Sequence, residues 1–314
     1  MQNKRVDFRN AFFDEFYKIA SKNKKVIFLA ADTDADGLVK FRKDFPKQFF
    51  NTGVTEQNAI SVAAGLAKSG KKVYVYSMVP FITLRCFEQI KIDICSMNLD
   101  VCLVGLGTGL SFSYYGSAGH GVIDIAVMRT LPEMTILNPS DPISAAKAAQ
   151  IINKKKGPKY VRLHKDPRPA IYNLNEKFKF GYQILKKEGK FCIISSGLMT
   201  ETALKIYQYL KDENINTSII DLFKIKPVDT LKLSKEIAQY KKIVTIEDNS
   251  IIGGIGSICS EIITDYDLKV KLKKFAIKDE QTFIYGSPEW LLKQYNLDDE
   301  GLKNSIKKFF LENK

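Results

Sequence analysis

The sequence predicts an α/β protein of two doubly wound domains, in which helices cover both faces of mostly parallel sheets. Short apolar and β-branched runs alternate with segments of helical periodicity along the chain. This alternation is typical of parallel strands joined by crossover helices. The chain has 314 residues, which is long for one hydrophobic core and ordinary for two domains.

The first domain is predicted at residues 1–175. Its strands are expected at 24–32, 71–79, 100–109, 133–141 and 159–164. Its helices are expected at 56–70, 83–98, 122–132 and 141–155. The last of these begins with Asp141 followed by Pro142, a favourable helix start.

The second domain is predicted at residues 176–314, after a polar, proline-bearing stretch. The alternation restarts there, with strands expected at 190–197, 216–223, 242–250 and 269–277. Helices are expected at 200–213, 229–241 and 253–266. Gly253, Gly254 and Gly256 are interpreted as close backbone packing at the start of the last helix, because the pattern is not that of a dinucleotide-binding fingerprint.

The composition indicates an ordinary globular protein, with 45% hydrophobic and 26% charged residues. No apolar run reaches 18 residues and the first ten residues lack the apolar core of a signal peptide. We therefore expect no membrane insertion and a cytoplasmic location. The five cysteines fall in predicted helices and strands without a CxxC pair, so neither a disulfide nor a metal site is expected.

The net charge of +13 raises the question of a nucleic-acid partner. Only seven of the 48 basic residues are arginine, and the lysines are spread along the chain in short clusters. A phosphate-binding groove favours arginine and interleaved aromatic residues. The pattern therefore favours solvated lysine faces, and no nucleic-acid partner is expected.

Glu56 is the acidic residue that calls for an explanation. Thr55 can cap a helix, and Glu56 then lies in the first turn, where the helix dipole favours an anion. The residues that follow, "NAISVAAGLA", are small or apolar on every side. Glu56 is therefore expected in a crowded, dry place, where a carboxylate is costly unless the site needs it.

The stretch "FFNTGVTEQNAISVAAGLAKSGKKVYVYSMVPF" resembles the pyrimidine-binding domain of transketolases and deoxyxylulose phosphate synthases. The resemblance continues through "ADTDADG", "SAGHGVIDIAVMRTLPEMTILNPSD", "SSGLMTETAL", "DLFKIKPVD" and "TIEDNSIIGGIGS". It implies a pyrimidine-binding thiamine diphosphate fold followed by a transketolase C-terminal-like domain. The implied cofactor is thiamine diphosphate.

The resemblance assigns roles around the coenzyme ring. Glu56 would be catalytic, because the family's glutamate hydrogen-bonds the N1′ atom of the aminopyrimidine and activates the coenzyme. Phe81 is the first choice for stacking on the ring; Tyr76 and Phe87 are further choices that could equally fill core. Arg85 matches an arginine found in several relatives and needs an acidic partner, either Glu88 or another acid.

The resemblance also suggests residues for a sugar or sugar phosphate substrate. His120 lies in the loop where a family histidine binds substrate hydroxyls and moves protons, although counting back from Arg129 places that histidine at Gly119. Asp32 opens the "DTDADG" segment, whose Asp34 and Asp36 lie near a serine that transketolases offer to a sugar phosphate. Arg162, His164 and Lys165 lie where the family often has a phosphate-binding arginine.

The family holds the coenzyme's diphosphate and metal ion with a glycine-aspartate-glycine turn and a later asparagine on a separate domain. This sequence has no such segment. We therefore expect a partner subunit that resembles the N-terminal half of transketolase and holds the diphosphate with Mg²⁺ or Ca²⁺, in an α2β2 assembly.

The predicted function is that of one subunit of a split transketolase, which transfers a two-carbon ketol unit between sugars. Two alternatives stay open at this point. One is the beta-type subunit of a 2-oxo acid dehydrogenase or a related carboligase. The other is a non-catalytic partner subunit.

Overall fold

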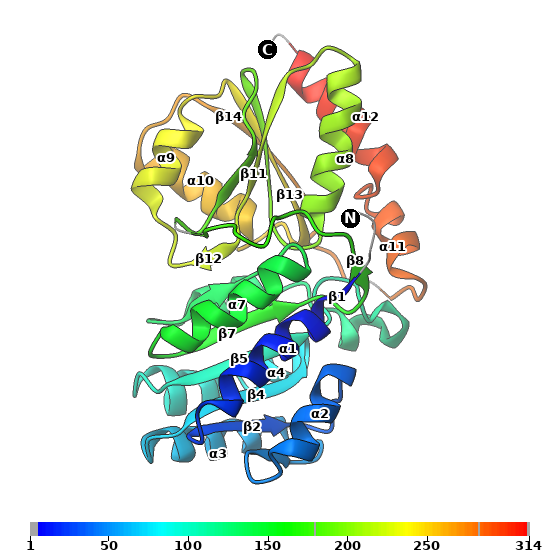
Figure 1. Ribbon diagram of the computed structural model, residues 1–314. Helices are drawn as coiled ribbons and strands as arrows, with labels where there is room; N and C mark the ends of the chain where they lie inside the picture. The colour runs from blue at the N-terminus through cyan, green and yellow to red at the C-terminus, as the bar shows by residue number, and fades with distance from the viewer. Residues whose placement is uncertain (1–5, 179, 282, 313–314) are drawn as a thin grey trace.

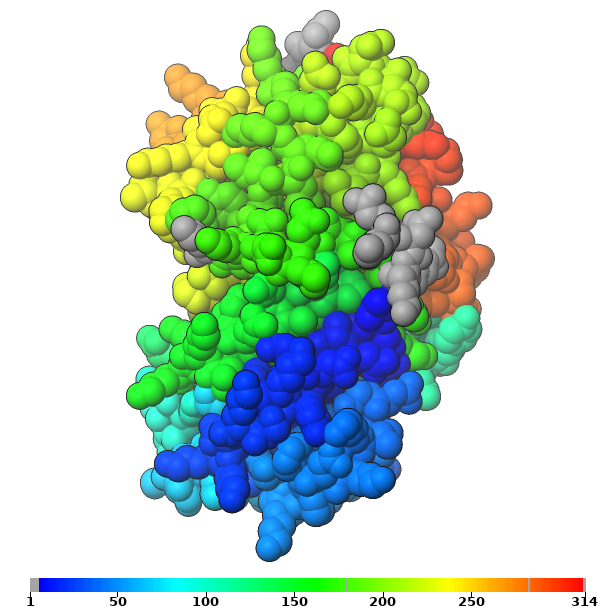
Figure 2. Space-filling model, in the orientation of Figure 1, coloured from blue at the N-terminus to red at the C-terminus, as the bar shows by residue number. Residues whose placement is uncertain are grey.

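The computed structural model describes residues 6–178, 180–281 and 283–312. It contains a seven-stranded and a five-stranded sheet, each with helices on both faces (Figure 1). Figure 2 shows the blue N-terminal segments at one end of this face and the yellow segments at the other, with green residues between them. The predicted fold class is confirmed.

The seven-stranded sheet has the order β12-β6-β7-β5-β4-β2-β3, and its strands are parallel except for β12. Six of its strands precede residue 175: β2 (Val26–Ala30), β3 (Phe49–Asn51), β4 (Lys72–Met78), β5 (Val101–Leu106), β6 (Thr135–Leu137) and β7 (Lys159–Leu163). The covering helices are α1 (Phe8–Ser21), α2 (Asp36–Asp44), α3 (Glu56–Lys68), α6 (Asp124–Arg129) and α7 (Pro142–Lys154). As predicted, Asp141 caps α7, accepting a hydrogen bond from the Ser144 amide at 2.7 Å.

Side chains of β4 alternate between two separate hydrophobic cores. Val73 and Val75 pack in the core that contains α3. Tyr74 and Tyr76 pack in the core that contains α1 and α2. This period of two decides which residues of β4 can approach Glu56.

The predicted helix at 83–98 is wrong in its first part. The chain instead forms the short α4 (Val79–Ile82), a turn, the three-residue α5 (Phe87–Gln89) and a π-helix, η1 (Ile90–Cys95). The backbone amides of Leu84 and Arg85 both donate to the Pro80 carbonyl, at 3.1 and 3.3 Å. The turn folds Arg85 back toward Phe81.

The five-stranded sheet has the order β14-β13-β10-β11-β9, with β9 antiparallel to its neighbour. Its strands are β9 (Gln183–Lys186), β10 (Phe191–Ser195), β11 (Thr217–Asp221), β13 (Lys242–Ser250) and β14 (Lys271–Ile277). In Figure 1, α8 and α12 lie on one side of this sheet and α9 and α10 on the other. The helices are α8 (Met199–Asp212), α9 (Thr230–Ile237), α10 (Ile255–Asp265), α11 (Pro288–Gln294) and α12 (Asp299–Leu311).

One strand from the second half of the chain completes the first sheet. β12 (Lys224–Lys226) pairs antiparallel with β6, Lys224 opposite Leu137. A two-stranded ribbon, β1 (Val6–Asp7) with β8 (Pro167–Arg168), precedes the crossing. The domain boundary near residue 175 falls between β8 and β9 and stays a prediction.

A buried carboxylate joins the two sheets. Asp221, at the end of β11, is fully buried and accepts hydrogen bonds from Ser140, at 2.8 and 2.7 Å, from Thr200 at 3.1 Å, and from Tyr172. Burial raises the pKa of Asp221 to about 7, although the three hydroxyl donors oppose the rise. This carboxyl therefore changes charge near neutral pH.

Asp221 should make the protein less stable as the pH rises. Its pKa is raised in the folded state, so the native protein binds the extra proton between the unfolded pKa of about 4 and the folded pKa of about 7. The resulting contribution to the free energy of unfolding is fully present below pH 4 and is lost as the pH rises through 7. It amounts to at most a few kcal/mol. Urea unfolding of Asp221→Asn at pH 4.5–8 should show a flatter pH dependence, whereas exposed Asp265→Asn should keep the parent slope. Equal slopes for the two variants would contradict this prediction.

All five cysteines are buried and free. In the described part of the chain, no helix is long and apolar enough to cross a membrane.

Candidate functional site

Glu56 is the first residue of α3 and is 2% exposed. Its two carboxylate oxygens have different partners. Oε1 accepts a hydrogen bond from the Ser77 hydroxyl at 3.2 Å, and Oε2 accepts one from Arg85 Nη1 at 2.7 Å. The predicted cap is not formed: Thr55 is the N-cap residue of α3, but its side chain makes no capping hydrogen bond.

Arg85 finds its acidic partner in Glu56 rather than in Glu88. Its guanidinium carbon also lies 4.0 Å from the centroid of the Phe81 ring. A guanidinium so placed gains a cation–π contact in addition to the ion pair. The structure thus brings together three of the residues predicted for coenzyme binding, Glu56, Phe81 and Arg85. The Arg85 side chain is 41% exposed, so it can leave Glu56 without being buried elsewhere.

Phe81 connects this group to a cavity of about 490 Å³. Its ring is part of the cavity wall, together with Leu84, Ser117 and His120. Lys278, Asp279 and Glu280 line the other side. Glu56 itself does not line the cavity.

His120 presents a free ring nitrogen in this wall. It is 7% exposed, and its Nε2 has no hydrogen-bond partner among the described residues. Burial lowers the pKa of His120 below its usual 6.5. The imidazole is therefore neutral at neutral pH and can accept or donate one proton at Nε2.

Gly119 explains why the histidine is shifted by one position. A Cβ atom at Gly119 would lie 2.7 Å from the Phe112 carbonyl oxygen and 2.8 Å from Tyr115 Cβ. Both neighbours belong to the tight segment around the 3-10 helix η2 (Ser113–Gly119). No side chain fits at position 119 in this conformation, and His120 is the imidazole that the loop supplies.

Tyr76 and Phe87 do not reach the cavity. Tyr76 is fully buried on the opposite face of β4, where its ring makes an edge contact with Phe13 at 5.2 Å. Phe87 packs on the core that contains α3. For Tyr76 the position argues against the stacking role, because strand alternation sends Ser77 and not Tyr76 toward Glu56. For Phe87 the position favours the core interpretation.

Arg162 lies in a closed polar cluster rather than in a cavity. It is 1% exposed, and its guanidinium donates to Asp124 at 2.7 and 3.2 Å, to Asn138 at 3.0 Å and to Asn249 at 2.7 Å. Burial opposes its charge, but the carboxylates of Asp124 and Asp248 outweigh burial and raise the pKa of Arg162. This position argues against a contact between Arg162 and a substrate phosphate.

The other predicted substrate residues lie outside the wall of this cavity. Asp32 is exposed after β2 and accepts a hydrogen bond from Asn51 at 3.2 Å. Lys165 is exposed, with its ammonium 5.1 Å from the Phe112 ring centroid. Asp34 forms an ion pair with Arg42 at 2.9 Å, which partly neutralises its charge.

The glycines of "EDNSIIGGIGS" pack against a carboxylate. Glu247 accepts hydrogen bonds from the amides of Ile255 and Gly256, at 2.8 and 2.9 Å, at the start of α10. A Cβ on Gly254 would lie 1.8 Å from Glu247 Oε2. The helix start already holds a carboxyl group of the protein, in agreement with the packing interpretation.

Two polar residues of the site were missed in the sequence. Ser77 is 1% exposed and completes the Glu56 pair; its signal is a lone hydroxyl in the otherwise apolar run "YVYSMV". Asn249 ties β13 to Arg162 and Asp124. No local pattern indicates that contact, because the partners are 87 and 125 residues away.

Among the residues described, no group of three or more His, Cys, Asp or Glu side chains is arranged to hold a metal ion.

Comparison with known proteins agrees with this geometry. Residues 4–169 match the transketolase pyrimidine binding domain, and residues 181–302 match the transketolase C-terminal domain. The chain is 32% identical to a subunit of apulose-4-phosphate transketolase from Phocaeicola vulgatus, over 98% of this chain and 99% of that protein. It is 31% identical to 1-deoxy-D-xylulose-5-phosphate synthase of Clostridium tetani, over 98% of this chain and 50% of that protein.

A solved structure described as a split gene transketolase, inactive beta4 tetramer, has a TM-score of 0.88 and 29% identity, covering 96% of this chain and 98% of that one. Two family models, a relative of matching length and a solved structure of the same fold therefore all point to one family. The chain belongs to the transketolase family.

Proposed function

We propose that the chain is the pyrimidine-binding subunit of a split transketolase and transfers a two-carbon ketol unit together with a partner subunit. The observation that carries the proposal is the buried Glu56 carboxylate, which Arg85 joins to the Phe81 ring. That ring lines a cavity that also holds a free imidazole nitrogen. The transketolase family and the apulose-4-phosphate transketolase relative favour this activity over the 2-oxo acid dehydrogenase alternative.

The residues present fit the aminopyrimidine end of thiamine diphosphate. Glu56 offers a buried oxygen whose present donor, Arg85, is exchangeable, and Phe81 offers an aromatic face. Bound there, the coenzyme supplies the nucleophilic carbon that takes up the ketol unit. The diphosphate and its Mg²⁺ or Ca²⁺ would be held by the partner, in an α2β2 assembly with each site between two unlike subunits.

Three residues of this chain then have separate tasks. Glu56 holds a proton at the ring nitrogen, from a position where bulk water does not compete. Ser77 fixes Glu56 Oε1 and so orients the other oxygen toward the ring. His120 Nε2 accepts or donates a proton at a substrate hydroxyl, because it lines the cavity and is neutral at neutral pH.

The lining of the cavity suits hydroxyl groups better than a phosphate on this chain's side. Lys278 lines the cavity together with two acidic residues, Asp279 and Glu280, so the local charge does not favour a dianion. We therefore propose that this subunit contacts the polyol part of a sugar. Any phosphate of the substrate would be held by the partner.

Reconstitution tests the proposal. The chain is mixed with a candidate N-terminal-half subunit, thiamine diphosphate, Mg²⁺, a ketose labelled with ¹³C at carbons 1 and 2, and an aldose. Transfer of both labelled carbons to the aldose without release of carbon dioxide is expected, and neither subunit alone should catalyse it. A parallel reaction replaces both sugars by a 2-oxo acid labelled with ¹³C at carbon 1. Release of labelled carbon dioxide there, without ketol transfer in the first reaction, would instead support the dehydrogenase alternative and overturn the proposal.

A further inference from the structure

Arg85 makes both of the contacts that the proposed function assigns to the coenzyme ring. Its Nη1 donates to Glu56 Oε2 at 2.7 Å, and its guanidinium carbon lies 4.0 Å from the centroid of the Phe81 ring. A guanidinium is planar and carries several N–H donors, so it can stack on an aromatic face while it binds a carboxylate. An aminopyrimidine ring is also flat and would use the same acid and the same aromatic residue. The side chain and the ring would therefore compete for one place.

Both carboxylate oxygens of Glu56 have a donor in the structure, so a ring that binds there must displace one of them. Ser77 holds Oε1 at 3.2 Å, and Arg85 holds Oε2. Ser77 is 1% exposed and lies on β4, which has a neighbouring strand on each side. The side chain of Arg85 is 41% exposed and belongs to the turn at residues 83–86. Arg85 is therefore the donor that can leave.

The backbone around Arg85 does not have to move when the guanidinium leaves. The amide of Arg85 donates to the Pro80 carbonyl at 3.3 Å, and the buried thiol of Cys86 donates to the Phe81 carbonyl at 3.1 Å. These bonds hold the turn against Phe81 independently of the Arg85 side chain. A rotation of that side chain into water would free Glu56 Oε2 and the Phe81 ring together.

We propose that Arg85 occupies the coenzyme site of the unloaded subunit and is displaced when the aminopyrimidine ring binds. This inference rests on the proposed function, because it requires the ring to bind at Glu56 and Phe81. In the unloaded chain the guanidinium neutralises a carboxylate that is 2% exposed and would otherwise be buried without a cation. Arg85 is thus an autoinhibitory residue, which stabilises the unloaded subunit and weakens its binding of thiamine diphosphate.

Removing the guanidinium should tighten coenzyme binding. The apparent Kd of a site equals its intrinsic Kd divided by the fraction of molecules in which the site is open. A partly exposed ion pair with a cation–π contact closes the site in most molecules and still yields to a ligand. We expect Arg85→Ala to lower the Kd for thiamine diphosphate by about three- to tenfold. An arginine that contacts the bound coenzyme would give the opposite sign.

Two measurements test the inference. Isothermal titration calorimetry follows thiamine diphosphate, with Mg²⁺ present, binding to the complex of this chain with the candidate N-terminal-half subunit. Arg85→Ala should bind more tightly than the parent, and Arg85→Lys, which keeps a cation without the planar group, should lie between them. Urea unfolding of the chain alone should show that Arg85→Ala is less stable than the parent, because Glu56 has lost its cation. Unchanged stability would mean that the guanidinium does not hold Glu56 in the unloaded chain, against the inference.

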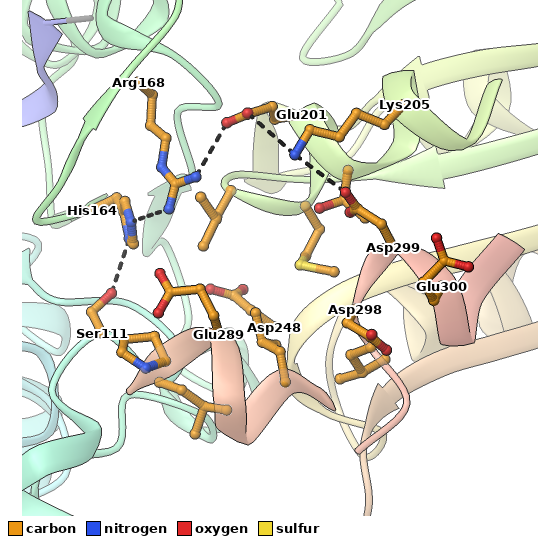
Figure 3. Close-up of a pocket in the computed structure, with 17 residues that line it drawn as sticks. Ser111, His164, Arg168, Glu201, Lys205, Asp248, Glu289, Asp298, Asp299 and Glu300 are labelled. Carbon is orange, nitrogen blue, oxygen red and sulfur yellow. Dashed lines mark hydrogen bonds and ion pairs between the residues drawn. The ribbon is translucent and has the colours of Figure 1, made fainter. Parts of the chain in front are cut away.

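Arg168 provides the matched control for the loss of an ion pair. It lines a second cavity, of about 430 Å³, where Figure 3 shows its guanidinium pointing toward Glu201 and His164. Its Nη1 lies 3.3 Å from Glu201, and its side chain is 24% exposed. Arg168→Ala should also destabilise the free chain but should keep the parent Kd for thiamine diphosphate. Tighter binding by this variant as well would attribute the effect to general loss of stability and overturn the inference.

The results separate this inference from the proposed function. If the parent complex binds thiamine diphosphate and Arg85→Ala binds it equally or more weakly, the autoinhibitory role is wrong and the proposed function stands. If the parent complex does not bind thiamine diphosphate, the proposed function fails and the inference fails with it. Should Arg85→Ala not fold, the Kd of Arg85→Lys decides by the same comparison with the parent.

Discussion

Replacing Glu56 by glutamine is expected to lower the kcat of the assembled enzyme by about 10²–10⁴-fold, the usual contribution of a positioned acid or base. The glutamine amide keeps the size of the side chain and can still contact Ser77. It cannot hold or release a proton at the coenzyme ring. The Glu56→Gln variant should still fold, because the Arg85 side chain is 41% exposed and water can solvate its charge when Glu56 is replaced.

The measurement is ketol transfer by the reconstituted enzyme, accompanied by calorimetric binding of thiamine diphosphate. Glu88→Gln is the matched control, since Glu88 is an exposed glutamate three residues after Arg85 and should leave turnover unchanged. Parent-like turnover of Glu56→Gln would remove Glu56 from the chemistry. It would also revive the interpretation of this chain as a non-catalytic partner.

Replacing Arg162 by methionine is expected to destabilise the protein by about 3–5 kcal/mol. The change removes the donors for Asp124, Asn138 and Asn249 and leaves the Asp124 carboxylate buried without its cation. The methionine fills much of the volume but satisfies none of these oxygens. Chemical denaturation, with circular dichroism as the signal, measures the loss.

Arg42→Met provides the comparison for this loss. Arg42 forms its ion pair with Asp34 at the surface, so its replacement should change stability by less than about 1 kcal/mol. If Arg162→Met were as stable as the parent but raised the KM for a phosphorylated sugar, Arg162 would bind substrate phosphate after all. The structural role argued from the buried cluster would then be wrong.

Most of the sheet architecture could be predicted because parallel strands are buried on both faces. β5, "VCLVGL", is buried along its whole length and appears in the sequence as a continuous apolar run. β13, "KIVTIEDNS", is also buried throughout, but only its first part shows apolar residues. The helix expected at 83–98 failed for a local reason. Its apolar spacing is helical, but the carbonyl of Pro80 captures two amides and makes a turn first.

The contacts of the candidate site were harder to predict from the sequence than the sheets were. Glu56 stands out in the sequence as a charged residue before an apolar helix. Its pairing with Arg85, 29 residues later, depends on that same turn. The burial of Tyr76 away from Glu56 depends on which face of β4 meets α3, and a sequence alone does not give the face. In the sequence, Arg162 has the features of an anion-binding residue. Only the structure shows that its guanidinium is buried against Asn249 and Asp124.

The crossing of β12 into the first sheet has a consequence for protein engineering. A fragment cut near residue 175 would lack the edge strand that hydrogen-bonds to β6, and the backbone of residues 135–137 would be left as a bare rim open to intermolecular pairing. Expression of the leading fragment alone should therefore yield aggregates. When the first domain is fused to another protein or exchanged with that of a relative, the fragment should extend through Lys226, so that it includes β12.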